Sequence, residues 1–366
     1  MRPLVAEINL DTLRQNYTLA CSCSGSSKSF AVVKANAYGH GAVECVRSLE
    51  DTASAFAVAS IEEALSLRIV GIRSPILLLE GIFEASELEL VDKYDLWLAV
   101  HTAWQVEALL SYTPLKPFSI WLKVDSGLHR LGFTPTRAVQ IWNKLERAKQ
   151  VGSLHLMSHF ATADAISVQF FNYQTLVMQS LRDYLGASLS LANSAALMSN
   201  TDNLGEWNRP GIMLYGSDPL EQASQISNEL QPVMTLRSRV IAMREIEAGA
   251  SVGYGGRWKA SKRARIAVVA GGYGDGYDRH AVNGTPVLIQ GKRAPVIGRV
   301  SMDMITVDIS HLDDVYIGSE AVLWGRASCG AYLSVDEVAR YCNTISYTLL
   351  TGVMPRVPRK YISSKS

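Results

Sequence analysis

The sequence contains few cysteines and no pair of them at the spacing of a redox or zinc motif. Disulfide frameworks and structural zinc sites generally need paired cysteines. The number here is odd and no Cys-x-x-Cys pair occurs, so we predict a reducing compartment and no metal site. The five cysteines are Cys21, Cys23, Cys45, Cys329 and Cys342.

Long apolar runs and a strong charge of either sign are also missing. No run approaches the roughly 20 apolar residues that span a bilayer, and the start MRPLVAEINLDTLRQNY lacks the apolar core of a signal peptide. The net charge is +1, so no overall field would draw the chain to nucleic acid or to an acidic membrane. The one basic cluster, at residues 259–266, is typical of a solvated loop. We predict a cytoplasmic protein that binds neither nucleic acid nor membranes.

Hydrophobic residues are abundant and make up 48% of the sequence. The chain has 366 residues, which exceeds what one hydrophobic core usually supports, so two domains are expected. Between residues 30 and 215 a short apolar run, a turn and a stretch of helical period follow one another repeatedly. In the stretch after residue 60, Ile61, Ala64, Leu65 and Ile69 are spaced to share one helix face. The eight runs are FAVVK (30–34), FAVAS (56–60), ILLLE (76–80), LWLAVH (96–101), SIWLKVD (119–125), LHLMSHF (154–160), SLSLANS (188–194) and GIMLYG (211–216).

Continuous apolar runs are typical of strands buried on both faces, and their alternation with helices indicates parallel strands with right-handed crossovers. Eight such units predict a (β/α)8 barrel of the TIM type. A doubly wound open sheet is the alternative, because periodicity alone cannot close a barrel.

From about residue 230 the pattern changes to short strands separated by glycine turns. One clear helix remains, SVDEVARYCN, with Ser334 as its N-cap and Glu337 three positions later. We predict a barrel domain over residues 1–229 and a mostly-β domain over residues 230–366, without a low-complexity linker between them.

Polar side chains stand at the carboxyl ends of the apolar runs, and in a barrel these ends share one mouth. Lys34 ends the first run. It could simply extend into solvent as most lysines do, but burial in a barrel mouth would lower its pKa and make its amine a nucleophile toward aldehydes. Pyridoxal phosphate is such an aldehyde. The other run-end residues are Ser60, Glu80, His101, Asp125, His159, Asn193 and Ser194.

An ordered set of motifs resembles the alanine racemase family, from the first strand to SYTLL at 346–350. The motifs are AVVKANAYGHG (31–41), KVDSGLHRLGF (123–133), MSHFATAD (157–164), LANSAA (191–196), RPGIMLYG (209–216), VGYGGRW (252–258) and RVSMDM (299–304).

The resemblance implies a pyridoxal 5'-phosphate cofactor, carried by Lys34 as an aldimine. It implies that Arg209 faces the pyridine nitrogen and keeps it unprotonated, although from the sequence a pairing of Arg209 with Glu206 is equally plausible. The implied remaining cofactor-binding residues are Tyr38, Asn193, Ser194, Gly211, Ile212 and Tyr347.

The resemblance also implies racemisation of alanine by two bases on opposite faces of the α-carbon. Lys34 would serve one face and Tyr254 the other, with His159 and Arg209 assisting the tyrosine. Tyr254 would come from the second chain of a homodimer with composite active sites. Lys123 matches a lysine that is often carbamylated in the family. The implied substrate and entrance residues are Arg130, Tyr273, Met302 and Asp303.

Two other functions use a similar barrel. A non-catalytic pyridoxal-phosphate-binding protein of cofactor homeostasis would share Lys34 but would not need Tyr254 or Asp303. A barrel-type amino acid decarboxylase should carry an acid where Arg209 stands. The racemase would either supply D-alanine for peptidoglycan or serve D-alanine catabolism.

Overall fold

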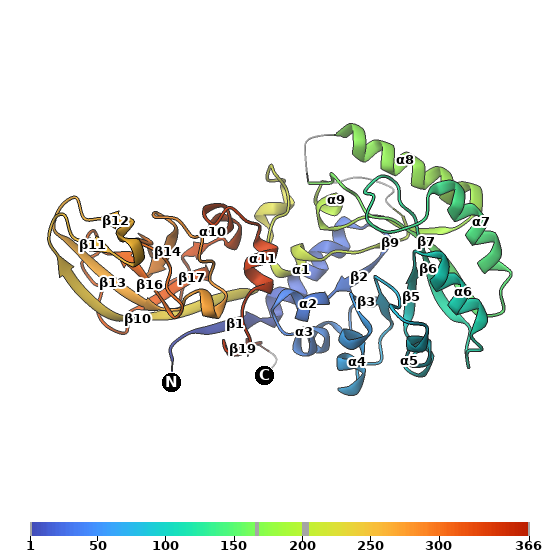
Figure 1. Cartoon of the computed structure of the whole chain (residues 1–366), viewed down its shortest axis with the longest axis horizontal. Helices are drawn as coiled ribbons and strands as arrows, with labels where there is room; N and C mark the ends of the chain where they lie inside the picture. Colours follow the sequence, from blue (N-terminus) through green and yellow to red (C-terminus); the bar gives the residue numbers. More distant parts are fainter. Residues whose placement is uncertain (1, 165–167, 200–204, 365–366) are drawn as a thin grey trace.

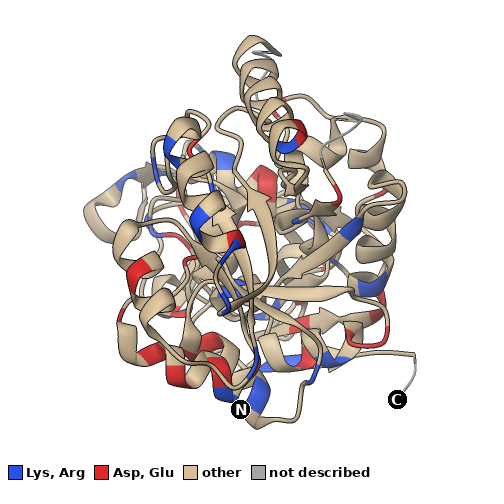
Figure 2. Cartoon of the chain, turned by 90° about the vertical axis from the view of Figure 1, so that its right-hand side faces the viewer, with Lys and Arg blue, Asp and Glu red and all other residues tan. Residues whose placement is uncertain are grey.

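The computed structural model describes residues 2–164, 168–199 and 205–364. It consists of two bodies joined end to end, a barrel surrounded by helices and a β-rich body that extends away from it (Figure 1). In the described part of the chain, no helix combines the length and the apolar character needed to cross a membrane. Charged residues of both signs are interspersed over the outer helices of the barrel (Figure 2).

The barrel is closed by eight parallel strands in sequential order, and the first strand pairs with the last. The predicted (β/α)8 barrel is therefore confirmed, and the open sheet is excluded. The strands are β2 (Lys28–Val32), β3 (Ala55–Val58), β4 (Ile76–Leu78), β5 (Trp97–Val100), β6 (Phe118–Lys123), β7 (Val151–Met157), β8 (Ser188–Ser190) and β9 (Trp207–Asn208).

Helices follow the strands and cover the outside of the barrel (Figure 1). They are α1 (Leu10–Cys23), α2 (Lys34–Tyr38), α3 (Ala42–Leu49), α4 (Ile61–Ile69), α5 (Leu88–Lys93), α6 (Ala103–Ser111), α7 (Pro135–Glu146), α8 (Val168–Leu185) and α9 (Ser194–Met198), with 3-10 turns η1 (Ala85–Glu87), η2 (Ile212–Tyr215) and η3 (Ile226–Asn228).

The last barrel strand differs from the prediction. Residues 211–216 were expected to form it, but η2 occupies this stretch and the two-residue strand β9 closes the barrel instead. Pro210 explains the difference, because proline has no N–H to donate to a ladder and ends the strand. The apolar run after Pro210 is buried as a tight turn. A buried turn and a buried strand both appear in the sequence as a short apolar run, so the pattern cannot distinguish them.

Aromatic rings fill the barrel near the amino ends of its strands. Phe30 packs against Trp207 with ring centroids 4.6 Å apart, and Trp121 stacks on His155 at 4.5 Å. Close-packed rings of this size leave no open channel at that end. The cavity described below therefore lies at the opposite end, where the strands finish.

The second body is built on a nine-stranded sheet, as the mostly-β prediction requires. Its strands are β1 (Val5–Asn9), β10 (Met234–Ile246), β13 (Ala264–Ala270), β14 (Pro286–Ile289), β15 (Lys292–Pro295), β16 (Met304–Asp308), β17 (Glu320–Arg326), β18 (Tyr332–Leu333) and β19 (Arg359–Ile362). A separate hairpin pairs β11 (Ser251–Val252) with β12 (Trp258–Lys259), and the other elements are η4 (Tyr254–Gly256), η5 (Tyr273–Asp275), α10 (Val335–Tyr341) and α11 (Ser346–Thr351).

The amino-terminal strand β1 belongs to this second sheet, between β10 and β19. The prediction grouped residues 1–229 with the barrel, so the chain enters the second body before it builds the first. Ser334 caps α10 as predicted, accepting a hydrogen bond from the N–H of Asp336 at 3.1 Å. Glu337 instead binds Arg293 at 2.6 Å.

The two bodies meet directly at α2 and α11. The Gly39 carbonyl accepts a hydrogen bond from Arg359 Nε at 3.1 Å, and a Cβ on Gly39 would lie 2.1 Å from the Leu350 carbonyl oxygen. Only glycine permits this approach, and the φ of +83° also favours it. The carboxyl-terminal body therefore packs against the segment that carries Lys34.

Candidate active site

Lys34 stands at the start of a left-handed turn, just beyond β2. The next four residues, Ala35 to Tyr38, have φ between 51° and 55°. This conformation costs L-residues roughly 1–2 kcal/mol each, so contacts with the surrounding structure must stabilise it. The turn directs the chain sharply around the barrel rim and leaves both Lys34 and Tyr38 facing the mouth.

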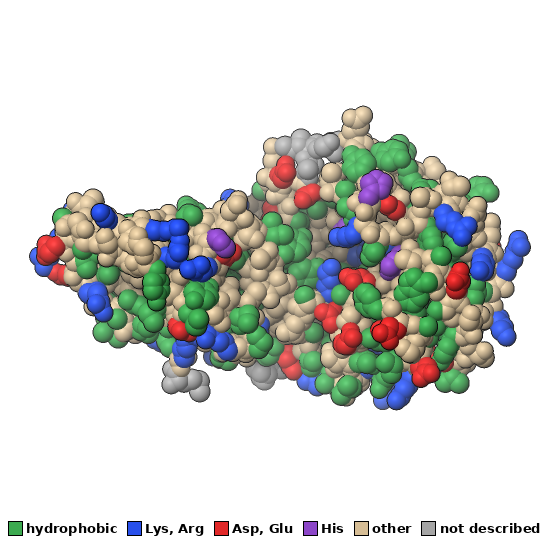
Figure 3. All heavy atoms as spheres, viewed as in Figure 1, with side chains coloured by type: hydrophobic (Ala, Val, Ile, Leu, Met, Phe, Trp, Pro, Cys, Tyr) green, Lys and Arg blue, Asp and Glu red, His purple; other side chains and the backbone are tan. Residues whose placement is uncertain are grey.

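A cavity of about 550 Å³ opens at this mouth. In the space-filling view the same face is hollowed beside the second body (Figure 3). The cavity collects the predicted site residues of the barrel half together with Tyr347 from α11. These are Lys34, Tyr38, Lys123, Arg130, His159, Asn193, Ser194, Arg209, Gly211, Ile212 and Tyr347.

Arg209 is a buried guanidinium, 6% exposed, at the floor of the cavity. Its Nη1 donates to Ser190 Oγ at 2.6 Å, and its Nη2 lies 3.4 Å from His159 Nδ1. The suggested pairing with Glu206 is wrong, because that carboxylate accepts the N–H of Leu189 and no carboxylate of the described residues lies within 4.0 Å of Arg209. Burial lowers the pKa of Arg209 to about 10, so it stays a cation at neutral pH.

His159 is kept neutral by its burial and by this neighbour. An arginine only donates, so His159 Nδ1 must accept its hydrogen bond and the ring hydrogen lies on Nε2. Burial, and next the charge of Arg209, hold the pKa of His159 well below its usual value. Its Nε2–H is therefore available as a donor to a group entering the cavity.

Two lysines in the cavity are shifted toward their neutral forms. Burial lowers the pKa of Lys34, the charges of Arg130 and Arg209 lower it further, and Glu80 and Glu63 oppose the shift. Burial and then Arg209 lower the pKa of Lys123 to about 8. Among the described residues that line the cavity, Glu80 is the one carboxylate. Its place at a strand end was the signal in the sequence, but it was not among the predicted site residues.

Hydroxyl groups and a close-packed glycine form one side of the cavity. Ser194 Oγ accepts the N–H groups of Gly211 at 2.9 Å and Met213 at 3.3 Å, which leaves its own hydrogen free to donate. Burial raises the pKa of both Tyr38 and Tyr347, so each keeps its phenolic hydrogen. A Cβ on Gly211 would lie 2.5 Å from Tyr38 Oη. These donors converge on a space suited to an anion such as phosphate.

The other predicted site residues of the second body, Tyr254, Tyr273, Met302 and Asp303, do not line this cavity. Tyr254 is 69% exposed and opens the short turn η4. Tyr273 and Met302 are also exposed, and the Asp303 carboxylate binds Arg356 at 2.6 Å. Within one chain, the structure therefore assembles the barrel half of the predicted site and leaves these residues on the surface.

Comparisons with known families agree with this arrangement. Residues 8–219 match the model described as "Alanine racemase, N-terminal domain", and residues 233–361 match "Alanine racemase, C-terminal domain". The chain belongs to the alanine racemase family. Both domains of that family are present in the expected order.

Alanine racemases of known name and structure resemble the chain over its full length. One from Chromohalobacter salexigens is 57% identical over 366 residues, covering 100% of this chain and 99% of that protein. One from Pseudomonas putida, named as catabolic, is 47% identical over 363 residues, 99% of each chain. The crystal structure of the biosynthetic alanine racemase from Pseudomonas aeruginosa superposes with a TM-score of 0.94 at 48% identity, covering 99% of this chain and all of that one.

Proposed function

We propose that the chain interconverts L-alanine and D-alanine with pyridoxal 5'-phosphate bound in the barrel cavity. The observation that carries this proposal is the buried Arg209 guanidinium, with His159 beside it and no carboxylate partner among the residues that the structure describes. The names of the full-length relatives support alanine as the substrate. The five free cysteines are consistent with the cytoplasm as the location. The reaction would supply D-alanine for peptidoglycan or feed its catabolism.

The cavity residues suit the cofactor at each of its polar ends. Lys34 offers a partly desolvated amine for the aldehyde. Tyr38, Ser194 and Tyr347 offer hydroxyl donors for the phosphate, with the backbone N–H of Ile212 beside them; the N–H of Gly211 donates to Ser194 Oγ in this structure and would turn to the phosphate when the cofactor binds. Asn193 caps α9 through the N–H of Ala196 at 3.0 Å and so fixes Ser194 next to it. When bound, pyridoxal phosphate withdraws electrons from the substrate's α-carbon and makes its hydrogen acidic.

Arg209 favours racemisation over the other reactions of this cofactor. As a permanent cation it cannot accept a proton from the pyridine nitrogen, and its charge keeps that nitrogen unprotonated. A decarboxylase would need an acid at this position. The arrangement instead favours return of a proton to the α-carbon.

Two side chains would exchange protons with the two faces of the α-carbon. We assign Lys34 Nζ to one face and Tyr254 Oη to the other. A phenol has a pKa near 10 and needs activation. The Nε2–H of His159 would donate to the Tyr254 oxygen and stabilise its deprotonated form, while Arg209 holds the imidazole in the required tautomer.

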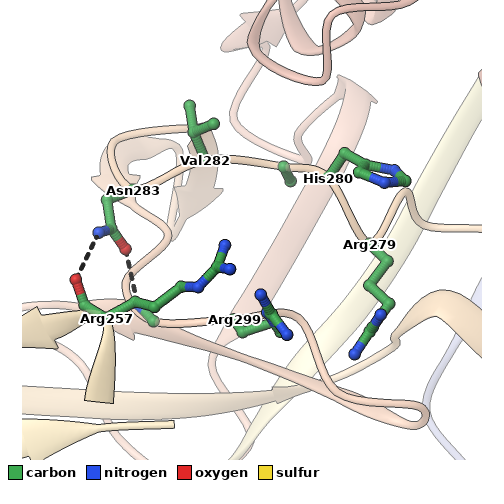
Figure 4. A pocket seen from close by; sticks show the side chains of 8 residues that line it. Arg257, Arg279, His280, Val282, Asn283 and Arg299 are labelled. Carbon is green, nitrogen blue, oxygen red and sulfur yellow. Dashed lines mark hydrogen bonds between the residues drawn. The ribbon is translucent and has the colours of Figure 1, made fainter. Parts of the chain in front are cut away.

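Because Tyr254 is exposed on the second body, we infer that it enters the cavity of a second copy. Arginines on the same body support this homodimer. Arg257, Arg279 and Arg299 surround a hollow of about 430 Å³ (Figure 4), and none of them has a carboxylate within 4.0 Å in the described ranges. The charge of Arg257, followed by desolvation, lowers the pKa of Arg299. The repulsion between the charges of such a cluster is lowered when the carboxylates of a partner face it.

Arg130 would bind the substrate carboxylate, as guanidinium geometry suits. With its pKa at about 8, Lys123 has a neutral fraction of about a tenth at pH 7 and about a quarter at pH 7.5. We propose that this neutral amine adds to carbon dioxide, forming an N–C bond and releasing one amine proton to solvent, and that the resulting carbamate anion orients Arg130. Tyr273, Met302 and Asp303 would border the entrance from the second copy.

The test is a chiral assay of the purified chain with added pyridoxal 5'-phosphate and a panel of L-amino acids. We expect D-alanine from L-alanine, and no D-alanine from a Lys34→Ala variant. Lys28→Ala is the matched control, because Lys28 lies at the other end of the same strand, over the Trp207 ring at 5.3 Å. Release of carbon dioxide would favour the decarboxylase, and cofactor binding without any turnover would favour the homeostasis protein.

A further inference from the structure

We propose that His40 is a positioning residue, whose neutral imidazole locks the left-handed turn Ala35–Tyr38 and so holds the Tyr38 hydroxyl beside Gly211. The inference rests on the proposed function in one respect, that the Tyr38 hydroxyl binds the cofactor's phosphate. The geometry of the turn itself does not depend on it.

The turn needs such a lock because left-handed backbone is unfavourable for residues with a Cβ. Four successive residues without a glycine adopt it here. Two side chains hold its beginning. The Glu63 carboxylate accepts the N–H of Ala35 at 2.7 Å, and the Asn36 side chain accepts the N–H of Ala42 at 2.8 Å. In the described hydrogen bonds, neither side chain binds the backbone of Ala37 or Tyr38, where the turn ends.

His40 supplies the contact at that end. It is 0% exposed, and its Nδ1 lies 3.0 Å from the Ala37 carbonyl oxygen and 2.9 Å from the Tyr38 carbonyl oxygen. Two acceptors at one ring nitrogen require a hydrogen on that nitrogen. Over the described chain His40 Nε2 has no hydrogen-bond partner, so a second ring hydrogen would be unsatisfied. The tautomer with Nδ1–H is therefore selected, and burial lowers the pKa of His40 to about 4.

A stack of rings connects this histidine to the cavity. The His40 ring lies on Tyr215 with centroids 4.5 Å apart, and Tyr215 lies on Tyr38 at 4.8 Å. The Tyr215 hydroxyl donates to the Val32 carbonyl at 2.9 Å, at the end of the strand that precedes Lys34. The imidazole thus fixes the Tyr38 backbone, and the stack fixes its ring. Removing the Nδ1–H takes this donor from the Tyr38 carbonyl and leaves the Ala37 carbonyl with the backbone N–H of His40, at 3.0 Å, and so allows the turn to relax.

Three variants separate positioning from ordinary core packing. His40→Leu keeps apolar bulk but removes the donor, whereas the amide nitrogen of His40→Asn can occupy the place of Nδ1. His155→Leu is the matched control, because His155 also stacks on an aromatic ring, Trp121, but at the far end of the barrel. The readouts are the dissociation constant of pyridoxal 5'-phosphate, the ³¹P chemical shift of the bound phosphate, and the melting temperature.

We expect His40→Leu to bind pyridoxal 5'-phosphate at least about tenfold more weakly, as loss of a buried donor implies, with its ³¹P resonance moved toward that of the free cofactor. His40→Asn should stay within roughly threefold of the unmodified protein. His155→Leu should lower the melting temperature and leave both cofactor readouts unchanged. A folded His40→Leu protein with unchanged affinity and unchanged ³¹P shift would overturn the proposal.

A measurement on the unmodified chain decides the matter if His40→Leu does not fold. Nitrogen-15 NMR of the histidine rings should show His40 with a protonated Nδ1 and a bare Nε2, unchanged from about pH 5.5 to pH 9. An Nε2–H tautomer, or titration near the ordinary histidine pKa, would contradict the lock. This measurement needs no cofactor, so it stands even if the chain binds no pyridoxal 5'-phosphate and the proposed function fails.

Discussion

Gly211→Ala adds one methyl group at the most crowded point of the cavity. The new Cβ would lie 2.5 Å from Tyr38 Oη, whereas ordinary contacts of a Cβ begin near about 3.4 Å. Either the hydroxyl or the 211 backbone must therefore move by roughly 0.9 Å. The backbone at Gly211 has φ −122° and ψ −91°, outside the main regions that alanine populates, so the double variant with Tyr38→Phe is needed to isolate the contact.

The cost follows from how firmly Tyr38 is held. Its ring packs between Tyr215 at 4.8 Å and Tyr347 at 5.9 Å, and its backbone lies in the locked turn. Overpacking of this kind costs about 1–3 kcal/mol, which corresponds to roughly 5- to 150-fold weaker binding if the cost falls on the complex with pyridoxal 5'-phosphate. Equilibrium titration of the cofactor, followed by its visible absorbance, measures the effect.

The double variant Gly211→Ala/Tyr38→Phe isolates the contact. Without the hydroxyl, the added methyl group has space, so the penalty of Gly211→Ala should largely disappear in the Tyr38→Phe background. Gly152→Ala is the control, because its Cβ would meet only Pro117, at 3.1 Å, at the start of β7. Wild-type affinity in Gly211→Ala, or an equal penalty in both backgrounds, would refute the proposed cradle.

Three further predictions test buried ionisable side chains. Arg209→Glu should lower the rate of racemisation by at least about 100-fold. It should also produce pyruvate as a side product, because an acid would protonate the pyridine nitrogen, and a coupled lactate dehydrogenase assay detects pyruvate. Unchanged racemisation would exclude the assigned role. The free energy of unfolding should rise with pH between about 4 and 6.5, because His40 binds a proton in the unfolded chain but not in the folded one, where its pKa is about 4. Urea titrations measure this free energy at pH 5 and at pH 7. The gain between the two pH values should be roughly 2 kcal/mol larger in the unmodified chain than in His40→Asn, and equal gains would contradict the assignment. Asp275→Asn should destabilise the second body by about 3 kcal/mol, because the buried carboxylate binds both Arg2 and Arg356; an unchanged urea midpoint would show that this network is not structural.

The sequence pattern predicted the barrel well because parallel strands buried on both faces produce a strong, repeated signal. It also predicted part of the mouth, since the topology of a barrel brings the strand ends together. Of the residues at these ends, Lys34, Glu80, His159, Asn193 and Ser194 line the cavity, and Ser60, His101 and Asp125 do not. Arg209 was assigned from the family motif, and its hydrogen bond to His159 required coordinates.

The remaining features depend on contacts between distant segments. β1 pairs with β10 and β19, and nothing local in its sequence distinguishes it from a barrel strand. On α4 the expected buried position Ile69 is 77% exposed, while Leu67 is buried. The helix face that packs on the barrel is formed by Ile61, Ala64 and Leu67. The left-handed turn was also missed, since alanine and tyrosine have no local preference for it and His40 enforces it from outside.

The central claim is that the Lys34 amine carries the cofactor. Borohydride reduces the C=N bond between an aldehyde and an amine to a stable secondary amine. Reduction of the chain in the presence of pyridoxal 5'-phosphate, followed by peptide mass spectrometry, therefore identifies the attached lysine directly. We predict a single pyridoxyl group on Lys34. Modification of Lys123 in its place, or no modified lysine at all, would contradict the account.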